Sequence, residues 1–378
     1  MTPKTNILKV IRFVLLLTSM IGFSRCERLH LEYSNVNYAE LEIKIDWQKC
    51  NQFNPPASTI LFYKEGEKEP LVEYIMGSQK VIKLGEGNYS VLAFNGRKNE
   101  FSHLTLDNIN NYSTAKVNVN NTTGLGPTGL SMVANADSLV CASTEKLEIT
   151  KEMIDKANSN NGKCTESSQP ARYELGIQPL PVSITCNIYF EVDRLYLVRP
   201  NGVSVILSGI AKSANLHDRQ NTLDAGSVLN EFKININESK VNGYIASRCF
   251  ILGFPGESIY PYDKNSPSII FKQKPLPSSF EKETQGIGKV ANSVRVDVEL
   301  VLKDAEKTIV KRTYNVSSNI TKKINLFGEV IYEINLTENP DNKIIVPNVT
   351  PENEQGLSPG VNDWGDENIV DIPLNPQK

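Results

Sequence analysis

Apolar and polar residues alternate with a period of two along much of this chain. Residues 40–47 place Leu41, Ile43 and Ile45 between charged neighbours. A strand with one buried face has this pattern, because successive side chains of a strand point to opposite sides. Residues 294–300 repeat it, with valine and leucine alternating with charged residues. The alternation therefore predicts half-buried β-strands.

Similar runs, bounded by Gly, Pro, Asn or Asp, follow one another at short intervals. Residues 89–94 are apolar at nearly every position, so we expect a strand buried on both faces. Many short strands separated by turns are typical of sandwiches and barrels, and we predict an all-β fold of two tandem β-sandwich domains. The other strand-like runs are residues 58–64, 70–76, 82–96, 182–193, 202–212, 231–237, 244–254, 268–272, 293–304, 308–316 and 329–336.

The regular pattern breaks between residues 122 and 178, and we expect this region to be irregular. A single helix is predicted at residues 150–158. Thr150 would cap its N-terminus, and Met153 and Ile154 would share its apolar face.

Changes in composition divide the chain into four segments, and a proline-bearing stretch at residues 177–183 marks the central boundary. The predicted segments are a signal peptide (1–25), an N-terminal β-sandwich domain (26–178), a C-terminal β-sandwich domain (179–338) and an acidic extended tail (339–378).

The acidic tail ends in a short apolar run that differs from the polar residues before it. This run has the composition of a last strand, which either completes the sheet of its own domain or pairs with another molecule. Its apolar residues, the candidates for a donated strand, are Ile369, Val370, Ile372 and Leu374.

The first 25 residues have the composition of an export signal. Residues 1–12 carry basic and no acidic residues, and the following apolar run ends at Arg25. That run is shorter than the roughly 20 apolar residues that span a bilayer. Cys26 follows directly, and it is either the site of lipid attachment, a half-cystine or an ordinary thiol. Acyl chains on Cys26 would anchor the chain to a membrane without a transmembrane helix.

The charge balance excludes nucleic acid as a partner. The net charge is −3, and removing residues 1–25 would make it more negative. Phosphate binding needs clustered lysine and arginine, and the sequence has no basic run.

The six cysteines show no pairwise spacing typical of a zinc site. Cys141 and Cys164 flank a polar stretch and are the candidates for a disulfide, with buried or loop thiols as the alternative.

No catalytic signature is present, and the three histidines lie far apart in the sequence. Hydrolase, phosphate-loop and dinucleotide-binding motifs are all missing. We therefore predict that the chain is not an enzyme and that it has no cofactor and no metal site. A carboxylate pair for glycoside hydrolysis would be recognised only in the folded structure.

Five stretches, taken in their order, resemble the fimbrillin-like lipoproteins of Bacteroidales. They are "ERLHLEY" after Cys26, "LEIKIDW", "KLGEGNYSVLAFN", "VSVILSGIAKSANL" and "VNDWGDENIVDIPL". The resemblance implies two immunoglobulin-like or transthyretin-like β-sandwiches. It also implies a palmitate-type lipid on Cys26 and display of the chain on the cell outer membrane.

The same resemblance implies a route of assembly. Some members of that group polymerise into fimbriae when proteolysis removes the first strand and a strand of a neighbouring subunit takes its place. In this chain, the donated strand would be the region around residues 369–374.

Together these observations predict a non-catalytic cell-surface lipoprotein that acts as a fimbrial subunit or as an adhesin-like structural component. Its partners would be the outer membrane, through the lipid anchor, and other fimbrial subunits, through strand exchange. The alternative is a surface lipoprotein that binds a glycan or a protein through loops such as residues 122–170, or, less favoured, a glycan hydrolase.

Overall fold

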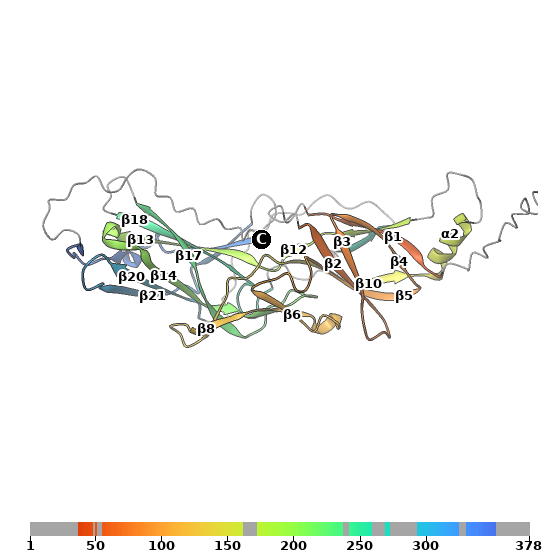
Figure 1. Ribbon diagram of the computed structural model, residues 1–378, viewed down its shortest axis with the longest axis horizontal. Coiled ribbons are helices and arrows are strands. Elements are labelled where there is room, and N and C mark those ends of the chain that lie inside the picture. The colour runs from red at the N-terminus through yellow and green to blue at the C-terminus, as the bar shows by residue number, and fades with distance from the viewer. Residues whose placement is uncertain are drawn as a thin grey trace, which may run out of the picture.

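The computed structural model describes residues 37–47, 50, 55–161, 172–236, 242–258, 269–272, 293–324 and 330–352. Strands dominate these residues, and they form two β lobes that lie end to end along the long axis of the molecule (Figure 1). The signal segment and the end of the acidic tail lie outside the described residues.

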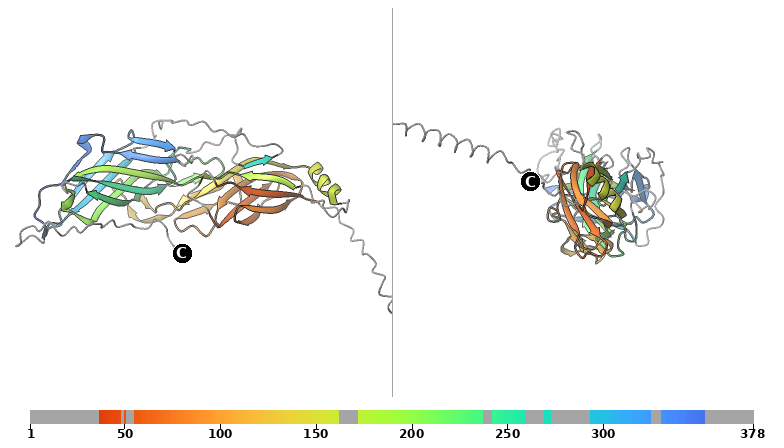
Figure 2. Two further views of the ribbon diagram at one scale, coloured as in Figure 1. Left: turned by 90° about the horizontal axis from the view of Figure 1, so that it is seen from above. Right: turned by 90° about the vertical axis from the view of Figure 1, so that its right-hand side faces the viewer.

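The N-terminal lobe consists of two sheets that face each other (Figure 2). Among the described residues, one sheet has the order β19-β11-β1-β4 and the other has the order β12-β10-β5-β2-β3. The strands are β1 (Ala39–Ile45), β2 (Ala57–Lys64), β3 (Leu71–Met76), β4 (Gln79–Leu84), β5 (Gly87–Asn95), β10 (Val140–Ile149), β11 (Arg172–Ile177), β12 (Leu180–Pro181) and β19 (Ile269–Lys272).

The C-terminal lobe contains three sheets within the described part of the chain. Their orders are β17-β18-β13-β23-β22 with β24 beside β13, β21-β20-β14-β16-β9-β8, and β15-β7-β6. The strands are β6 (Leu104–Asp107), β7 (Lys116–Val119), β8 (Asn121–Leu125), β9 (Ser131–Val133), β13 (Ile184–Asp193), β14 (Val198–Ala211), β15 (Ser213–Asn215), β16 (Ala225–Leu229), β17 (Glu231–Ile236), β18 (Asn242–Ile251), β20 (Arg295–Leu302), β21 (Ile309–Asn315), β22 (Ile320–Ile324), β23 (Val330–Asn335) and β24 (Ile344–Ile345).

Strands from each half of the sequence join the other lobe. β19 pairs with β11 in the N-terminal lobe, although it follows β18 in the sequence. β9 in turn pairs in parallel with β16 in the C-terminal lobe, although it precedes β10. Each lobe therefore contains strands from both halves of the sequence. The domain boundary at residue 178 stays a prediction.

The strands that the alternating pattern predicts most clearly are present. In β1, Leu41, Ile43 and Ile45 are buried while the residues between them are partly exposed. β5 is buried on both faces from Val91 to Phe94, as its run of apolar residues predicts. Both predictions are confirmed. A strand with one solvent-exposed face buries every second residue, and a strand packed on both faces buries consecutive residues.

The prediction for residues 122–178 is only partly correct. The helix is present as α2 (Lys151–Asn161), and the backbone N–H of Met153 donates to Oγ1 of Thr150 at 3.4 Å. However, β10 (Val140–Ile149) is a strand in a region expected to be irregular. Its pairing with β5 shifts register between Thr144 and Leu147. This bulge inserts extra residues and hides the strand period.

The apolar residues form two clusters. The smaller, the inner core, lies between the two sheets of the N-terminal lobe and includes Phe62 and Val91. The larger, the shared core, fills the C-terminal lobe and also takes Leu61, Leu92 and Phe94 from the other face of the β10-β5-β2 sheet. A single sheet therefore separates two cores and joins the lobes.

Candidate functional site

Most of the site residues predicted from the sequence lie outside the described residues. They are Cys26, Cys164, Ile369, Val370, Ile372 and Leu374. Lipid attachment, the disulfide and strand donation therefore stay predictions.

Cys141 is described, and it lies at the contact between the two lobes. Its Sγ atom, fully buried on β10, donates to the carbonyl oxygen of Leu216 at 3.5 Å. Burial raises the pKa of the Cys141 thiol to about 11. Beside it, Oγ of Ser143 donates to the carbonyl oxygen of His217 at 2.7 Å. This part of β10 thus fastens the N-terminal lobe to the loop at residues 216–217.

Two of the histidines are described, and each has a carboxylate beside it. Nδ1 of His103 lies 3.4 Å from Asp137, and Nε2 of His217 lies 3.4 Å from Asp218. Over the described residues, no group of three or more histidine, cysteine, aspartate or glutamate side chains has the arrangement of a metal site. In the same residues, no helix has the length and hydropathy needed to cross a bilayer.

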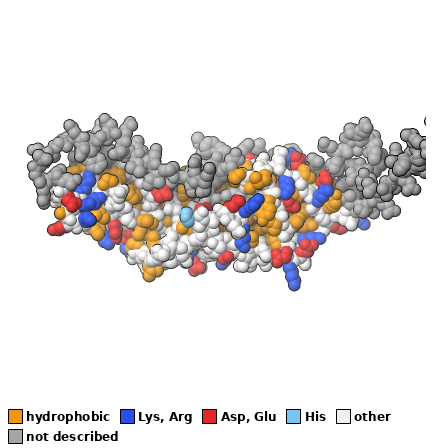
Figure 3. All heavy atoms as spheres, in the orientation of Figure 1, with side chains coloured by type: hydrophobic (Ala, Val, Ile, Leu, Met, Phe, Trp, Pro, Cys, Tyr) orange, Lys and Arg blue, Asp and Glu red, His pale blue; other side chains and the backbone are white. Residues whose placement is uncertain are grey.

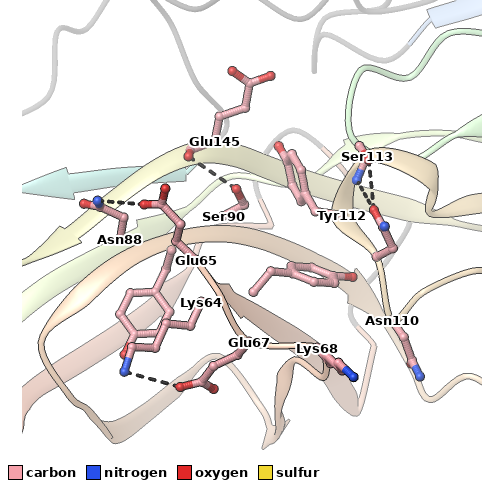
Figure 4. Close-up of a pocket in the computed structure, with 13 residues that line it drawn as sticks. Lys64, Glu65, Glu67, Lys68, Asn88, Ser90, Asn110, Tyr112, Ser113 and Glu145 are labelled. Carbon is pink, nitrogen blue, oxygen red and sulfur yellow. Dashed lines mark hydrogen bonds and ion pairs between the residues drawn. The ribbon is translucent and has the colours of Figure 1, made fainter.

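A pocket of about 670 Å³, with both polar and apolar lining, opens on the N-terminal lobe (Figure 4). Four separate segments line it: the end of β2 with the turn that follows, the start of β5, the loop at residues 110–113, and Glu145 on β10. Its volume lies within the range of small-molecule sites in proteins. The pocket is therefore the candidate binding site of the described structure.

Two tyrosines form one side of the pocket and are held rigidly. The hydroxyl of Tyr63 donates to the carbonyl oxygen of Ile109 at 2.6 Å, and burial raises the pKa of Tyr63. The rings of Tyr63 and Tyr112 meet edge to face with centroids 5.6 Å apart, and Tyr112 lies 5.6 Å from the ring of His217. Both tyrosines pack against the shared core. The pocket therefore rests on the contact between the lobes.

Polar side chains form the opposite side of the pocket. Nδ2 of Asn88 donates to Oε2 of Glu65 at 3.0 Å, and Nζ of Lys64 lies 3.3 Å from Oε1 of Glu67 (Figure 4). Gly87 allows the second arrangement, because a Cβ atom there would lie 2.8 Å from Cε of Lys64. The ion pair and the amide–carboxylate hydrogen bond place both hydrogen-bond donors and acceptors along this side of the pocket.

Two backbone features complete the lining. The side chain of Asn111 accepts bonds from the backbone N–H and Oγ of Ser113, which fixes the loop at residues 110–113. Oγ of Ser90 donates to the carbonyl oxygen of Glu145 at 3.3 Å, and Glu145 lies in the bulge of β10. The side chain of Glu145 points away from the other residues that line the pocket (Figure 4). Bulges often re-aim a side chain at a functional site.

Charge is nearly balanced over the lining, which carries two lysines and three glutamates. On the face of the N-terminal lobe seen in Figure 3, basic and acidic side chains lie close together beside apolar ones. The arrangement offers hydrogen bonds and ring faces, and it does not concentrate one sign of charge. It suits binding of an uncharged polar group.

Sequence reasoning did not find this pocket. Its residues come from four segments between positions 63 and 145, and no short motif links them. The one local signal is the bulge of β10, which interrupts an otherwise regular strand within the region predicted to be irregular.

Comparison with known proteins places the chain in a family. Residues 25–231 match the family described as "Domain of unknown function (DUF5119)". This match covers more than half of the chain, so the chain belongs to that family.

Over 141 residues the chain is 26% identical to a protein of Bacteroides ovatus named "Putative fimbrium anchoring subunit Fim4B". The match covers 37% of this chain and 41% of that protein, so it spans less than half of the relative. It confirms the resemblance to fimbrillin-like proteins.

Two solved structures resemble the fold. A crystal structure of "a putative adhesin" from Bacteroides ovatus has a TM-score of 0.53 at 17% identity, over 86% of this chain and 98% of that one. The fimbrial anchor protein Mfa2 of Porphyromonas gingivalis gives a TM-score of 0.41 at 13% identity, over 79% and 90% of the two chains. The first likeness confirms the all-β sandwich fold.

Proposed function

We propose that this chain is a non-catalytic protein of the cell surface with a fimbrial or adhesin-like role. The observation that carries the proposal is the match to Fim4B, a protein named for anchoring a fimbrium. The all-β architecture supports it, because stacked sandwiches make an elongated, rigid body suited to display outside the cell (Figure 1).

The proposal extends to an anchor at the outer membrane. The apolar segment before Arg25 and the cysteine that follows it support export and acylation of Cys26. Two or three acyl chains hold a soluble domain at a membrane, since each buried methylene contributes about 0.8 kcal/mol. In this position the protein would connect a fibre to the cell rather than form its shaft.

Contact with other subunits would use strand exchange. Residues 369–374 supply an apolar run after a long acidic stretch, which is suited to pair with the sheet of a neighbouring subunit. Main-chain hydrogen bonds would supply the affinity, and alternate side chains would fill pockets in the acceptor.

The experiment separates surface from interior in the native host. Intact cells that produce the tagged chain are treated with protease, and the sheared fibre fraction and the outer-membrane fraction are then blotted. We expect cleavage on intact cells and recovery with membrane or fibres. Complete protection, with the chain only in the cytoplasmic fraction, would overturn the proposal.

The variant Cys26→Ala tests the anchor separately from the surface role. We expect this variant to leave the outer-membrane fraction and appear in the medium or periplasm. Chymotryptic peptides of the wild-type N-terminus should carry the mass of the acyl chains. Unchanged membrane recovery of Cys26→Ala would refute lipid anchoring and leave the surface role standing.

A further inference from the structure

We propose that the pocket between β2, β5 and the loop at residues 110–113 binds an uncharged oligosaccharide. The inference rests on the proposed function, because it gives an adhesin-like surface protein a ligand. It assigns the chemistry of recognition to side chains that the sequence analysis did not single out.

The lining matches the chemistry of sugar hydroxyls. A hydroxyl both donates and accepts, and it needs neighbours of both kinds when it leaves water. The pocket offers two acceptors, the carboxylate of Glu65 and the backbone carbonyl of Glu145, and it offers amide groups from Asn88 and Asn110. The lysine of the turn, Lys68, adds a donor.

The two tyrosines supply the apolar part of the recognition. The negative face of an aromatic ring attracts the C–H groups on one face of a sugar ring, and aromatic residues bury large areas. Tyr63 and Tyr112 are each fixed by the edge-to-face contact between them, and Tyr63 also by its bond to Ile109. A ligand therefore does not have to order them on binding, which lowers the cost of association.

The charge of the lining argues against other classes of ligand. The two lysines lie among the carboxylates of Glu65 and Glu67 and give no excess of positive charge, so a phosphate, a sulfate or a nucleic acid finds no clustered cations. A purely apolar ligand would cover the carboxylates and amides of the lining without giving them hydrogen bonds, although the tyrosine rings offer it apolar surface. An uncharged polyhydroxyl compound meets both limits.

Preorganisation of the wall distinguishes this pocket from an ordinary surface hollow. Glu65 accepts a hydrogen bond from Asn88, and an ion pair joins Lys64 to Glu67 in the turn that carries Lys68. The carbonyl oxygen of Glu145 is held in place by Ser90 in the bulge of β10. These contacts restrict the wall before any ligand binds, which lowers the cost of association.

The test uses the full chain after removal of its signal segment and isothermal titration calorimetry. The probes are lactose, diacetylchitobiose and maltotriose, with sialyllactose as the charged comparison. We expect at least one uncharged probe to bind and sialyllactose to bind more weakly than lactose. Absence of binding by all three uncharged probes, or stronger binding of sialyllactose than of lactose, would overturn the proposal.

The double variant Glu65→Ala, Asn88→Ala places the binding in the pocket. Both side chains are exposed, so the fold is retained, which thermal unfolding checks. We expect affinity to fall at least about tenfold, as two hydrogen bonds to sugar are lost. Asn121→Ala, an exposed asparagine on β8 in the C-terminal lobe, is the matched control and keeps wild-type affinity. Equal affinity of the double variant would place binding elsewhere and refute the assignment.

The double variant also separates the two proposals. Its recovery in the outer-membrane and fibre fractions should equal that of the wild type, because the pocket is remote from Cys26 in the sequence. Surface display with no sugar binding would sink this inference alone. Loss of surface display by the wild type would sink the proposed function.

Discussion

The two cores of the molecule differ in how they are enclosed. The inner core, around Phe62, lies between the two sheets of the N-terminal lobe and is confined to that lobe. The shared core, around Phe94, continues from the C-terminal lobe onto the outer face of the same sheet. Residues 60–62 of β2 show the difference directly, since Ile60 and Phe62 belong to the inner core and Leu61 to the shared core.

This difference teaches that the sheet β10-β5-β2 is a common wall. A strand that faces a core on both sides needs apolar residues at consecutive positions, as Val91 to Phe94 show. The lobes are therefore coupled by packing and not merely linked by the chain. Removing a side chain from the shared core should affect both lobes.

The largest expected effect comes from the phenylalanines on the two faces of this wall. Phe94→Ala and Phe62→Ala each remove a fully buried ring, and each should lower the free energy of unfolding by about 3–5 kcal/mol. Because the wall is common, we expect one cooperative transition in both variants. In a Trp364→Phe background, fluorescence of Trp47, which packs against the inner core, and far-UV circular dichroism should report the same midpoint in urea. Separate midpoints for Phe94→Ala would show that the lobes unfold independently.

A smaller effect is expected from two glycines in left-handed conformations, one in each lobe. Gly209 on β14 has a φ of 87°, and a Cβ atom there would lie 2.8 Å from the backbone oxygen of Ser293. Gly66, in the turn after β2, has a φ of 83° and no atom within 4 Å of such a Cβ. Gly209→Ala should cost about 3 kcal/mol or more and Gly66→Ala about 1 kcal/mol, measured by urea unfolding. Equal losses of stability in the two variants would mean that the backbone at Ser293, just before β20, moves to accommodate the methyl group without a cost in free energy.

The hydrogen bond from Ser143 to His217, which joins the lobes, should contribute less to the free energy of unfolding. Ser143→Ala leaves the carbonyl oxygen of His217 without this donor, and we expect a loss of about 1 kcal/mol. Ser90→Ala, which removes an exposed bond within the N-terminal lobe, is the matched control and should change stability by less than about 0.5 kcal/mol. Thermal unfolding of both variants measures the difference. A control that loses as much as Ser143→Ala would deny any special role to the contact between lobes.

The smallest effect is a dependence on pH that originates at Asp304 in the C-terminal lobe. The hydroxyl of Thr308 donates to Asp304, and together with the backbone N–H of Thr308 and the charge of Arg199 it lowers the pKa of Asp304 below its ordinary value of 3.8. A lowered pKa in the folded state stabilises the protein above that ordinary value, and the contribution disappears as pH falls through the lowered pKa. Thr308→Val should therefore be less stable than the wild type at neutral pH.

The difference between Thr308→Val and the wild type should shrink in acid, as urea unfolding at a series of pH values would show. A constant difference down to the acid transition would mean that the hydroxyl acts through packing alone. Because the lobes share a wall, the fluorescence of Trp47 in the N-terminal lobe and far-UV circular dichroism should report the same midpoint within each protein.

The sequence predicts the parts of the fold that depend on local pattern. β1 and β20 follow from alternation, and α2 follows from Thr150 and the apolar pair Met153 and Ile154. Each of these elements buries one face. The apolar residues of such a face recur at a fixed spacing, which can be recognised within a single stretch of sequence. The all-β class follows from the number of such stretches.

The pairing of strands that lie far apart in the sequence cannot be predicted from such spacing. The pairing of β9 with β16 joins residues 132–133 to residues 227–228, and β19 pairs with β11 across the boundary that composition suggests. Such pairings depend on how sheets pack and not on the pattern of either strand. β10 was missed because its bulge, between Thr144 and Leu147, breaks the period of two.

The pocket was beyond prediction for the same reason. Tyr63, Asn88 and Tyr112 come together only when β2, β5 and the loop before β7 are packed against each other. In the sequence, none of these three residues differs from an ordinary exposed or half-buried residue. Their common position depends on the shared core beneath them.

The central claim, that this chain acts at the cell surface as a fimbrial or adhesin-like component, is tested most directly by immunogold electron microscopy. Intact cells of the native host are labelled with antibody raised against the folded protein, beside a deletion strain. We predict gold on the outer surface of the wild type, along or at the base of fibres, and none on the deletion strain. Gold confined to the cell interior, with a surface as bare as that of the deletion strain, would contradict the account.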